Sequence, residues 1–319
     1  MTGAACPGAI CRGTAAALWS ALLLAATIVP TQAATWRAAQ NDAELEVNFT
    51  DAIAAGVENG LPLAACRGPL AGGVQVGRIR RDFTTCHVGY GGREVEASPF
   101  EMLGTAWQEA TGPQAPNDSL VAGYELVERE PNRISTNRLH PCRTGFQGGV
   151  HLGQTRSGER GCSIGFGGKQ IVAWVYEVLS AAPMLTWVVS TPRSIPETAI
   201  VGGSEKGEPF FVCRAASLAG LHPGKVKRSS LGCSIVTQGN EAVVDRFEVL
   251  VSRWIQANGG SVPVAAMPSG RENSGSQYVC RTRSRNTVQV GKVSEQLNGC
   301  HVGMDGREVI FKDYEVLGQ

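Results

Sequence analysis

Short runs of β-branched and aromatic residues recur along the chain and are separated by clusters of glycine, asparagine and serine. Examples are PFFVCRA at 209–215, VQVGKV at 288–293 and REVIFKDYEVL at 307–317. The clusters return roughly every eight to twelve residues, which is the spacing of strands in an antiparallel meander or sandwich. No stretch after residue 34 keeps a 3.6-residue hydrophobic period with capping signals at both ends. The pattern predicts an all-β protein.

Residues 1–34 follow a different pattern. Arg12 is their only charged residue, an apolar run extends from Ala15 to Val29, and small residues follow as far as Ala33. This order is typical of a secretory signal peptide. The alternative is a membrane anchor, but a run of about fifteen residues is shorter than the ~20 that cross the hydrocarbon core. We therefore expect a secreted protein, periplasmic if the source is bacterial, with no membrane span after signal removal.

The rest of the chain repeats one unit. Its eight cysteines form four pairs whose members lie twenty positions apart: Cys66/Cys86, Cys142/Cys162, Cys213/Cys233 and Cys280/Cys300. An arginine follows each first cysteine: Arg67, Arg143, Arg214 and Arg281. A glycine lies eleven residues after each first cysteine: Gly77, Gly153, Gly224 and Gly291. An aromatic-Glu-apolar-Leu motif closes each unit, at 100–103, 176–179, 247–250 and 314–317. Such gapless self-similarity is the signature of a repeat architecture.

Two further landmarks bound the units. A tryptophan opens each one: Trp36, Trp107, Trp187 and Trp254. A Gly-x-Glu motif precedes each first cysteine and ends at Glu58, Glu125, Glu205 and Glu272. These landmarks define a first segment at 36–103, a second at 107–179, a third at 187–250 and a fourth at 254–317. The second segment carries nine extra residues between its Glu and its cysteine, which predicts a lengthened loop.

The motifs as a set resemble a known family. The third segment shows them best, with FVCRA at 211–215, HPGKV at 222–226 and FEVL at 247–250. This unit resembles the DM9 repeat, a DUF3421-type domain, over essentially the whole chain after residue 34. The resemblance implies tandem repeats that form two pseudo-symmetric β-sandwich-like lobes stapled by disulfides. It also implies sugar binding, since some relatives are mannose-recognising lectins.

The cysteine pattern favours disulfides over metal. His87 and His301 follow second cysteines, but the other two segments have Ser163 and Ser234 there, so a zinc ligand set would be incomplete in half of the copies. In an oxidising compartment an even number of cysteines is typical of structural disulfides. Repetition makes one bridge within each segment the natural connectivity, and an exchange between paired segments remains open. No carboxylate cluster resembles a calcium loop, so we expect no metal and no other cofactor.

The arginine after each first cysteine faces the other side of its strand if the cysteine faces inward. There it could pair with the Gly-x-Glu glutamates or with the glutamates of the closing motif. Its recurrence at one position in four segments favours such a structural ion pair over contact with an acidic ligand.

Glycine-rich sequences after each second cysteine predict hairpin turns, because strand-like sequence follows them where a phosphate loop would need a helix. The resemblance implies that a basic residue just past the glycine contacts sugar. That position holds Arg93, Lys169, Asn240 and Arg307. The resemblance also implies an aspartate five residues after the first cysteine, but this sequence has Ala71, Gln147, Leu218 and Arg285 there. Gln147 with Lys169 comes nearest to the pattern, and Glu94, Glu241 and Glu308 are candidate acceptors.

Charge and motif content narrow the function classes. With 29 Lys+Arg against 28 Asp+Glu, the chain lacks the basic excess of a nucleic-acid binder. None of the five histidines lies in a hydrolase motif, and the carboxylates recur with the fold instead of forming one asymmetric site. We therefore expect a metal-independent, lectin-like recognition protein that is not an enzyme, with glycans or cell-surface components as partners. A protein–protein or defence-related scaffold is the alternative, and a glycoside hydrolase is a third reading.

Overall fold

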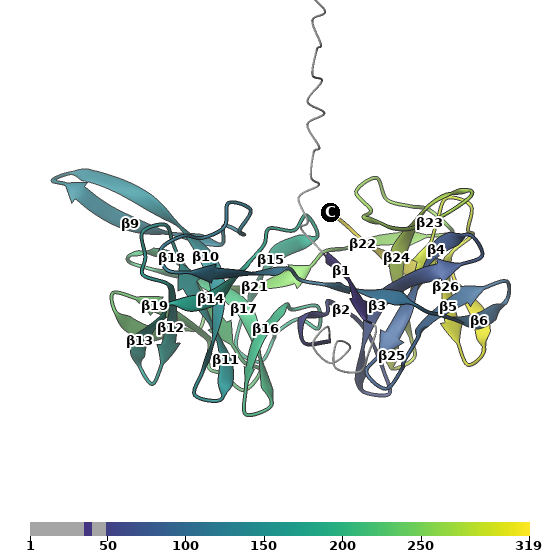
Figure 1. Cartoon of the computed structure of the whole chain (residues 1–319), viewed down its shortest axis with the longest axis horizontal. Helices are drawn as coiled ribbons and strands as arrows, with labels where there is room; N and C mark the ends of the chain where they lie inside the picture. Colours follow the sequence, from purple (N-terminus) through teal and green to yellow (C-terminus); the bar gives the residue numbers. More distant parts are fainter. Residues whose placement is uncertain (1–34, 40–48) are drawn as a thin grey trace, which may run out of the picture. The chain divides into compact units, whose positions relative to one another are not determined.

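A computed structural model describes residues 35–39 and 49–319 (Figure 1). Within these residues almost all regular structure is β-strand, which confirms the predicted class. The signal peptide predicted for residues 1–34 lies outside the described part of the chain. Among the residues described, no helix has the length and apolar character needed to cross a membrane.

Seven strands correspond to each of the four sequence segments. The first has β1 (Thr35–Ala39), β2 (Ala54–Glu58), β3 (Leu61–Leu70), β4 (Gly73–Arg80), β5 (Cys86–Tyr90), β6 (Arg93–Ala97) and β7 (Phe100–Gly104). The second has β8 (Trp107–Thr111), β9 (Gly123–Glu130), β10 (Arg133–Phe146), β11 (Gly149–Thr155), β12 (Cys162–Phe166), β13 (Lys169–Ala173) and β14 (Val175–Leu179). The third has β15 (Leu185–Ser190), β16 (Val201–Glu205), β17 (Glu208–Ser217), β18 (Gly220–Val226), β19 (Cys233–Thr237), β20 (Asn240–Val244) and β21 (Phe247–Ser252). The fourth has β22 (Trp254–Asn258), β23 (Pro268–Glu272), β24 (Gly275–Ser284), β25 (Thr287–Val293), β26 (Cys300–Met304), β27 (Arg307–Phe311) and β28 (Asp313–Leu317).

The strands form two sheets of fourteen, and each sheet combines two segments. The first and fourth segments form one sheet, which we call the 1/4 lobe, and the second and third form the other, the 2/3 lobe. In the 1/4 lobe the pairings β2–β25, β27–β6 and β3–β4 close β3, β2, β25, β26, β27, β6, β5 and β4 into a ring of eight strands. The 2/3 lobe has the same order with its own strands. Neither lobe can close without strands from two segments.

The repeated glycine has a steric cause. In the second segment, Gly153 of β11 pairs with Cys142 of β10 on one side and with Ile164 of β12 on the other. A Cβ atom built on Gly153 would lie 2.0 Å from the Ser163 carbonyl oxygen. Any side chain here would therefore push β12 away from β11. The equivalent glycines of the other segments meet carbonyl oxygens at 2.0–2.2 Å in the same way: Gly77, Gly224 and Gly291.

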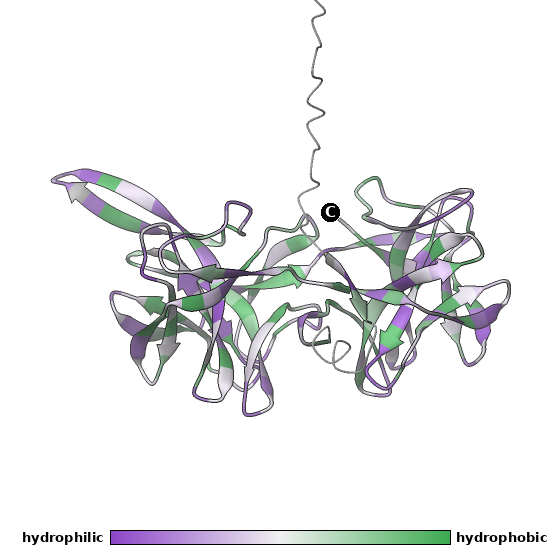
Figure 2. Ribbon diagram, in the orientation of Figure 1, coloured by the Kyte–Doolittle hydropathy of each residue, from purple (hydrophilic) through white to green (hydrophobic). Residues whose placement is uncertain are grey.

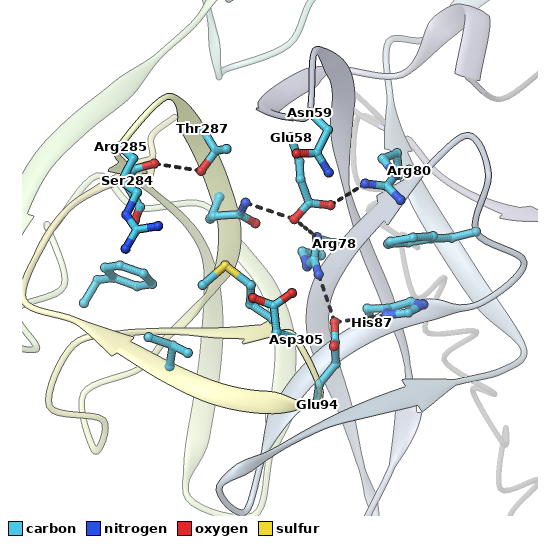
Figure 3. Close-up of a pocket in the computed structure, with 15 residues that line it drawn as sticks. Glu58, Asn59, Arg78, Arg80, His87, Glu94, Ser284, Arg285, Thr287 and Asp305 are labelled. Atoms are coloured by element: carbon cyan, nitrogen blue, oxygen red, sulfur yellow. Dashed lines mark hydrogen bonds and ion pairs between the residues drawn. The ribbon is translucent and has the colours of Figure 1, made fainter.

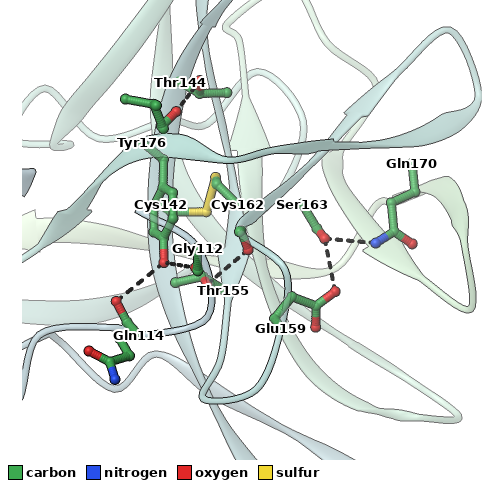
Figure 4. Close-up of a disulfide and its surroundings, with 12 residues drawn as sticks. Gly112, Gln114, Cys142, Thr144, Thr155, Glu159, Cys162, Ser163, Gln170 and Tyr176 are labelled. Carbon is green, nitrogen blue, oxygen red and sulfur yellow. Dashed lines mark hydrogen bonds between the residues drawn. A yellow bond between two sulfur atoms is a disulfide. The ribbon is translucent and has the colours of Figure 1, made fainter. Parts of the chain in front are cut away.

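The four disulfides form within segments, so no exchange between segments occurs: Cys66–Cys86, Cys142–Cys162, Cys213–Cys233 and Cys280–Cys300. All eight cysteines are fully buried, and each bridge lies in a hydrophobic cluster of its own segment. Figure 4 shows the second bridge beside Tyr176, whose hydroxyl donates to the Gly112 carbonyl at 2.9 Å. Each bridge closes a twenty-residue loop, which stabilises the fold by about 3 kcal/mol in the chain-entropy model.

A larger hydrophobic cluster joins the two lobes. It contains buried residues from all four segments, among them Leu63, Leu179, Leu250 and Leu317. Figure 2 shows hydrophobic and hydrophilic residues along the strands and hydrophilic residues at several hairpin ends. Because both lobes pack on this buried cluster, the strands that line the pockets between neighbouring segments are held in place.

Candidate functional site

The repeated arginines form the same structural unit in every segment. In the first segment, Arg67 donates through Nε to Glu101 at 2.7 Å, and its guanidinium lies 4.4 Å from the ring centroid of Trp36. The other three units repeat this geometry: Arg143 with Glu177 and Trp107, Arg214 with Glu248 and Trp187, and Arg281 with Glu315 and Trp254. We call this unit the Trp–Arg–Glu stack. Of the two glutamate partners left open by the sequence, the structure uses the one in the closing motif, which leaves the Gly-x-Glu glutamates for other roles.

The glycine-rich loops are tight hairpin turns. Their two central residues all have positive φ, for example 60° and 80° at Gly91 and Gly92, and 53° and 75° at Asp305 and Gly306. Positive φ at both positions is the requirement of a type I′ turn, which glycine, asparagine and aspartate satisfy best. Strands follow the turns, so these are not phosphate loops.

The residues just past these turns lie in facing pairs. Arg93 of β6 is opposite Arg307 of β27 in the 1/4 lobe, and Lys169 of β13 is opposite Asn240 of β20 in the 2/3 lobe. All four are exposed. The structure thus places the predicted rim residues where two hairpins from different segments meet.

The predicted acceptor glutamates hold these hairpins together. The Gly306 amide donates to Glu94 Oε2 and the Gly92 amide donates to Glu308 Oε2, both at 2.8 Å. In the other lobe the Gly168 amide donates to Glu241 Oε2 at 3.0 Å. One carboxylate oxygen of each glutamate is therefore already used across the joint.

Gln147 and Lys169 come from different hairpins of the second segment. Gln147 is exposed in the turn between β10 and β11, with φ of 50°, whereas Lys169 begins β13. No hydrogen bond joins them among the described residues. Their role in sugar contact stays a prediction.

A deeper polar pocket lies in the 1/4 lobe and draws on both of its segments (Figure 3). Its cavity volume is about 730 Å³. The first segment contributes the polar side chains Glu58, Arg78, Arg80, His87 and Glu94, and the fourth contributes Ser284, Arg285, Thr287 and Asp305. Arg285 is the residue five positions after the fourth segment's first cysteine. It shares the pocket with Glu94 of another segment, a combination that has no local signal in the sequence.

The centre of this pocket is a fixed network around Arg78. Its Nη1 donates to Glu58 at 2.8 Å, its Nη2 donates to Glu94 at 2.9 Å, and its Nε donates to the Gly303 carbonyl at 2.6 Å. Arg80 donates to the second oxygen of Glu58 at 2.6 Å. The side chain of Arg78 is 4% exposed and those of the two glutamates 13% and 12%. The network is therefore held rigidly at the floor of the pocket.

Glu94 also binds His87, whose Nδ1 lies 3.0 Å from Oε1. Burial alone opposes ionisation of Glu94. The hydrogen bonds from Gly306 and His87 and the charge of Arg78 outweigh that effect and lower the pKa of this carboxyl. Above the floor, the ring of Phe83 stacks on His87 with centroids 4.1 Å apart. The same ring lies 4.5 Å from the Arg80 guanidinium, so one aromatic side chain supports the fixed donors and acceptors of the pocket.

The corresponding region of the 2/3 lobe is built differently. By position relative to the cysteines, Ser284, Gln289 and Met304 of the pocket correspond to Phe146, His151 and Phe166. These three rings pack against one another, with centroids 5.1–6.3 Å apart. Lys225, the counterpart of Arg78, is buried there and donates to the Gly165 carbonyl at 2.5 Å. Burial lowers the pKa of Lys225.

Two residues of this pocket lie in or beside repeated motifs, but the sequence pattern indicated a structural role for the Gly-x-Glu glutamates, as partners of the repeated arginines. Glu58 ends a repeated Gly-x-Glu motif, and Arg78 directly follows the repeated glycine Gly77. Within the described residues, no group of three or more His, Cys, Asp or Glu side chains is arranged to hold a metal ion.

The chain belongs to the DM9 repeat family. The family model described as "DM9 repeat" matches three overlapping stretches, residues 56–171, 132–244 and 204–311. The division into four repeats and the DUF3421 naming stay predictions. No curated protein matches this chain. Among solved structures, the crystal structure of the nematode sperm cell motility protein MFP2B is 10% identical, covering 84% of this chain and 94% of that one with a TM-score of 0.18. A likeness of that size carries no argument about function.

Proposed function

We propose that this protein is a non-catalytic recognition protein that binds carbohydrate in the polar pocket of the 1/4 lobe. The observation that carries the proposal is the rigid array of Glu58, Arg78, Arg80 and Glu94 beside the ring of Phe83. Sugar hydroxyls both donate and accept hydrogen bonds, so they require donors and acceptors that are held in place before binding. The ring of Phe83 packs against His87 at 4.1 Å and the Arg80 guanidinium at 4.5 Å, so it supports the array.

Membership of the DM9 repeat family supports a recognition role. The four buried disulfides support an extracellular or periplasmic location, where such bonds persist. The absence of a catalytic role is part of the proposal. It rests on the network itself, because the two guanidinium groups of Arg78 and Arg80 balance the two carboxylates of Glu58 and Glu94. A hydrolase needs one of its two carboxyls to hold a proton.

The experiment is a glycan array on the oxidised protein from residue 35 onward, with EDTA present. Wild-type protein is compared with Glu58→Gln and with Glu205→Gln, the matched change in the third segment. Binding to a coherent set of glycans should be lost in Glu58→Gln and kept in Glu205→Gln. Gln147→Ala with Lys169→Ala tests the alternative rim site in parallel. Binding lost only in that double variant would move the site to the rim, and turnover of arrayed glycosides would overturn the non-catalytic role.

A second function, protein–protein recognition, is favoured by the long hairpin of β9 and β10. The nine extra residues of the second segment fall in this hairpin, which projects from the 2/3 lobe (Figure 1). It exposes Tyr124, Leu126 and Ile134, the last with 68% of its surface accessible. Exposed apolar residues on a projecting hairpin are typical of contact with another protein. A blank glycan array together with cell-surface binding that is lost in Ile134→Asp would select this function.

A further inference from the structure

The four Trp–Arg–Glu stacks differ in what the far end of each arginine contacts. Arg67 donates through Nη1 to the Ser269 carbonyl at 3.1 Å. Arg214 donates in the same way to the Ala122 carbonyl at 3.2 Å. Both acceptors precede the Gly-x-Glu motif of the other segment in the same lobe. The guanidinium thus joins the two segments of its lobe.

The remaining two arginines depart from this arrangement in opposite ways. Arg143 turns both Nη atoms to the buried carboxylate of Asp51, at 2.5 and 3.2 Å. Arg281 donates only through Nε, to Glu315 at 2.7 Å, and stacks on Trp254 at 4.3 Å. Among the described residues, neither Nη1 nor Nη2 of Arg281 makes a hydrogen bond to the protein. Its side chain is only 16% exposed, so little bulk water replaces the missing partner.

Arg281 lines a cavity of about 520 Å³ between the 1/4 lobe and the third segment. Most of the lining is small and apolar: Ala54, Ala55, Gly56, Val57, Pro62, Pro209 and Val288. The acceptor that Arg281 would use by analogy, the carbonyl of Ala55, belongs to this wall. The unpaired end of the guanidinium therefore lies beside an apolar wall of the cavity.

A second arginine adds positive charge. Arg228 lines the same cavity, and its hydrogen bonds go to the carbonyls of Ile195 and Pro196, at 2.7 and 3.3 Å. No carboxylate of the described residues forms an ion pair with it. The one acidic side chain in the lining, Glu197, is 70% exposed and lies 3.6 Å from Arg283. The cavity as a whole favours an anion over a cation.

We propose that this cavity is a second ligand site, which binds a small molecule with one carboxylate and an apolar body. The planar edge formed by Nη1 and Nη2 of Arg281 matches a carboxylate in bidentate geometry. The apolar wall of β2 and β25 takes the rest of the molecule. Asp51 on Arg143 is the internal precedent, because there a carboxylate of the chain itself occupies the same end of an equivalent arginine. The proposal is independent of the carbohydrate site.

The test uses isotope-labelled oxidised protein from residue 35 onward and a series of probes: hexanoate, phenylacetate and 4-phenylbutyrate, each with its neutral amide. The carboxylates should shift the backbone amide resonances of Ala54–Val57 and Thr198. Each neutral amide should bind at least about tenfold more weakly, as loss of a charge-assisted pair implies. This comparison needs no variant, so it holds even where a substitution disturbs folding.

Matched variants then assign the effect to one residue. Arg281→Gln should weaken carboxylate binding by about tenfold or more, and Arg228→Gln should weaken it less. Arg67→Gln loses the same glutamate and tryptophan contacts in a stack that does not line this cavity, so it should leave the affinity unchanged. The proposal fails if no carboxylate moves the Ala54–Val57 resonances, if acids and amides bind alike, or if Arg67→Gln weakens binding as much as Arg281→Gln.

Discussion

Removing the guanidinium from two equivalent Trp–Arg–Glu stacks should destabilise the protein to very different degrees. Arg143→Met and Arg67→Met both delete the ion pair and the stacking on tryptophan. The side chain of Arg143 is 10% exposed and faces Asp51, which is 6% exposed. The side chain of Arg67 is 26% exposed and its partner Glu101 is 40% exposed. The two substitutions are chemically identical and differ in the burial of the charge they leave behind.

The magnitudes follow from that difference. At Arg67, loss of a half-exposed ion pair costs about 0.2–1 kcal/mol, and loss of the cation–π contact costs about 0.5–1 kcal/mol. At Arg143, leaving a buried carboxylate without its partner costs about 3–5 kcal/mol. Arg37 still donates to Asp51 at 2.9 Å, which places the cost near the lower end. We expect Arg143→Met to lower the free energy of unfolding by about 1–2 kcal/mol more than Arg67→Met does.

The assay is urea unfolding of the oxidised protein, followed by far-ultraviolet circular dichroism so that the altered tryptophan environments do not enter the signal. Adding Asp51→Asn to Arg143→Met should recover part of the loss, because the buried negative charge is then gone. Equal midpoints for the two single variants, or a double variant less stable than Arg143→Met, would show that burial of Asp51 does not determine the energy of this stack.

Two further predictions concern the backbone and the titration of the fold. Gly224→Ala should prevent native folding of the 2/3 lobe, because its Cβ would lie 2.0 Å from a carbonyl oxygen. Gly145→Ala is the control and should fold normally, because no atom lies within 4 Å of its Cβ. Proteolysis and circular dichroism compare the two variants. Burial lowers the pKa of three histidines, which are His140, His151 and His222. The unfolded chain therefore binds protons first, and the thermal midpoint should fall as pH drops from about 7 through the ordinary histidine pKa of about 6.5. The lowered pKa of Glu94 adds its own loss only at more acid pH, below about 4.3. A thermal midpoint that is flat between about pH 7 and 5 would mean that the histidines keep their ordinary pKa values.

Local features of the structure were predictable because their causes lie within one segment. The twenty-residue spacing of Cys142 and Cys162 returns in every segment and made a bridge within each segment the natural connectivity, which the structure has. The strand-like sequence after each glycine-rich loop predicted the hairpins correctly. The recurrence of Arg143 indicated an ion pair, although the sequence could not choose between two glutamates. Geometry chooses, because Arg143 lies directly opposite Glu177 in the pairing of β10 with β14.

The pocket was not predictable because its two walls are far apart in the sequence. Glu58 and Arg78 belong to the first segment, whereas Arg285 and Asp305 belong to the fourth. Nothing in a single segment indicates that the first pairs with the fourth and not with the second. The resemblance implies that the position five residues after the first cysteine acts together with the glycine-rich hairpin of the same segment. In the structure, Arg285 at this position of the fourth segment shares a pocket with Glu94, which follows the hairpin turn of the first segment. Only the closed strand order, with β2 beside β25, creates that neighbourhood.

A comparison of the four segments distinguishes residues that build the fold from residues that define a site. The bridge cysteines, the glycine that lets two strands approach, and the Trp–Arg–Glu stack occur in all four, so internal repetition marks them as scaffold. The pocket combines a glutamate that repeats in all four segments, Glu58, with positions that differ between segments. Where the 1/4 lobe has Ser284 and Met304, the 2/3 lobe has Phe146 and Phe166 in mutual contact. One framework therefore supports an open polar pocket in one lobe and a packed aromatic cluster in the other.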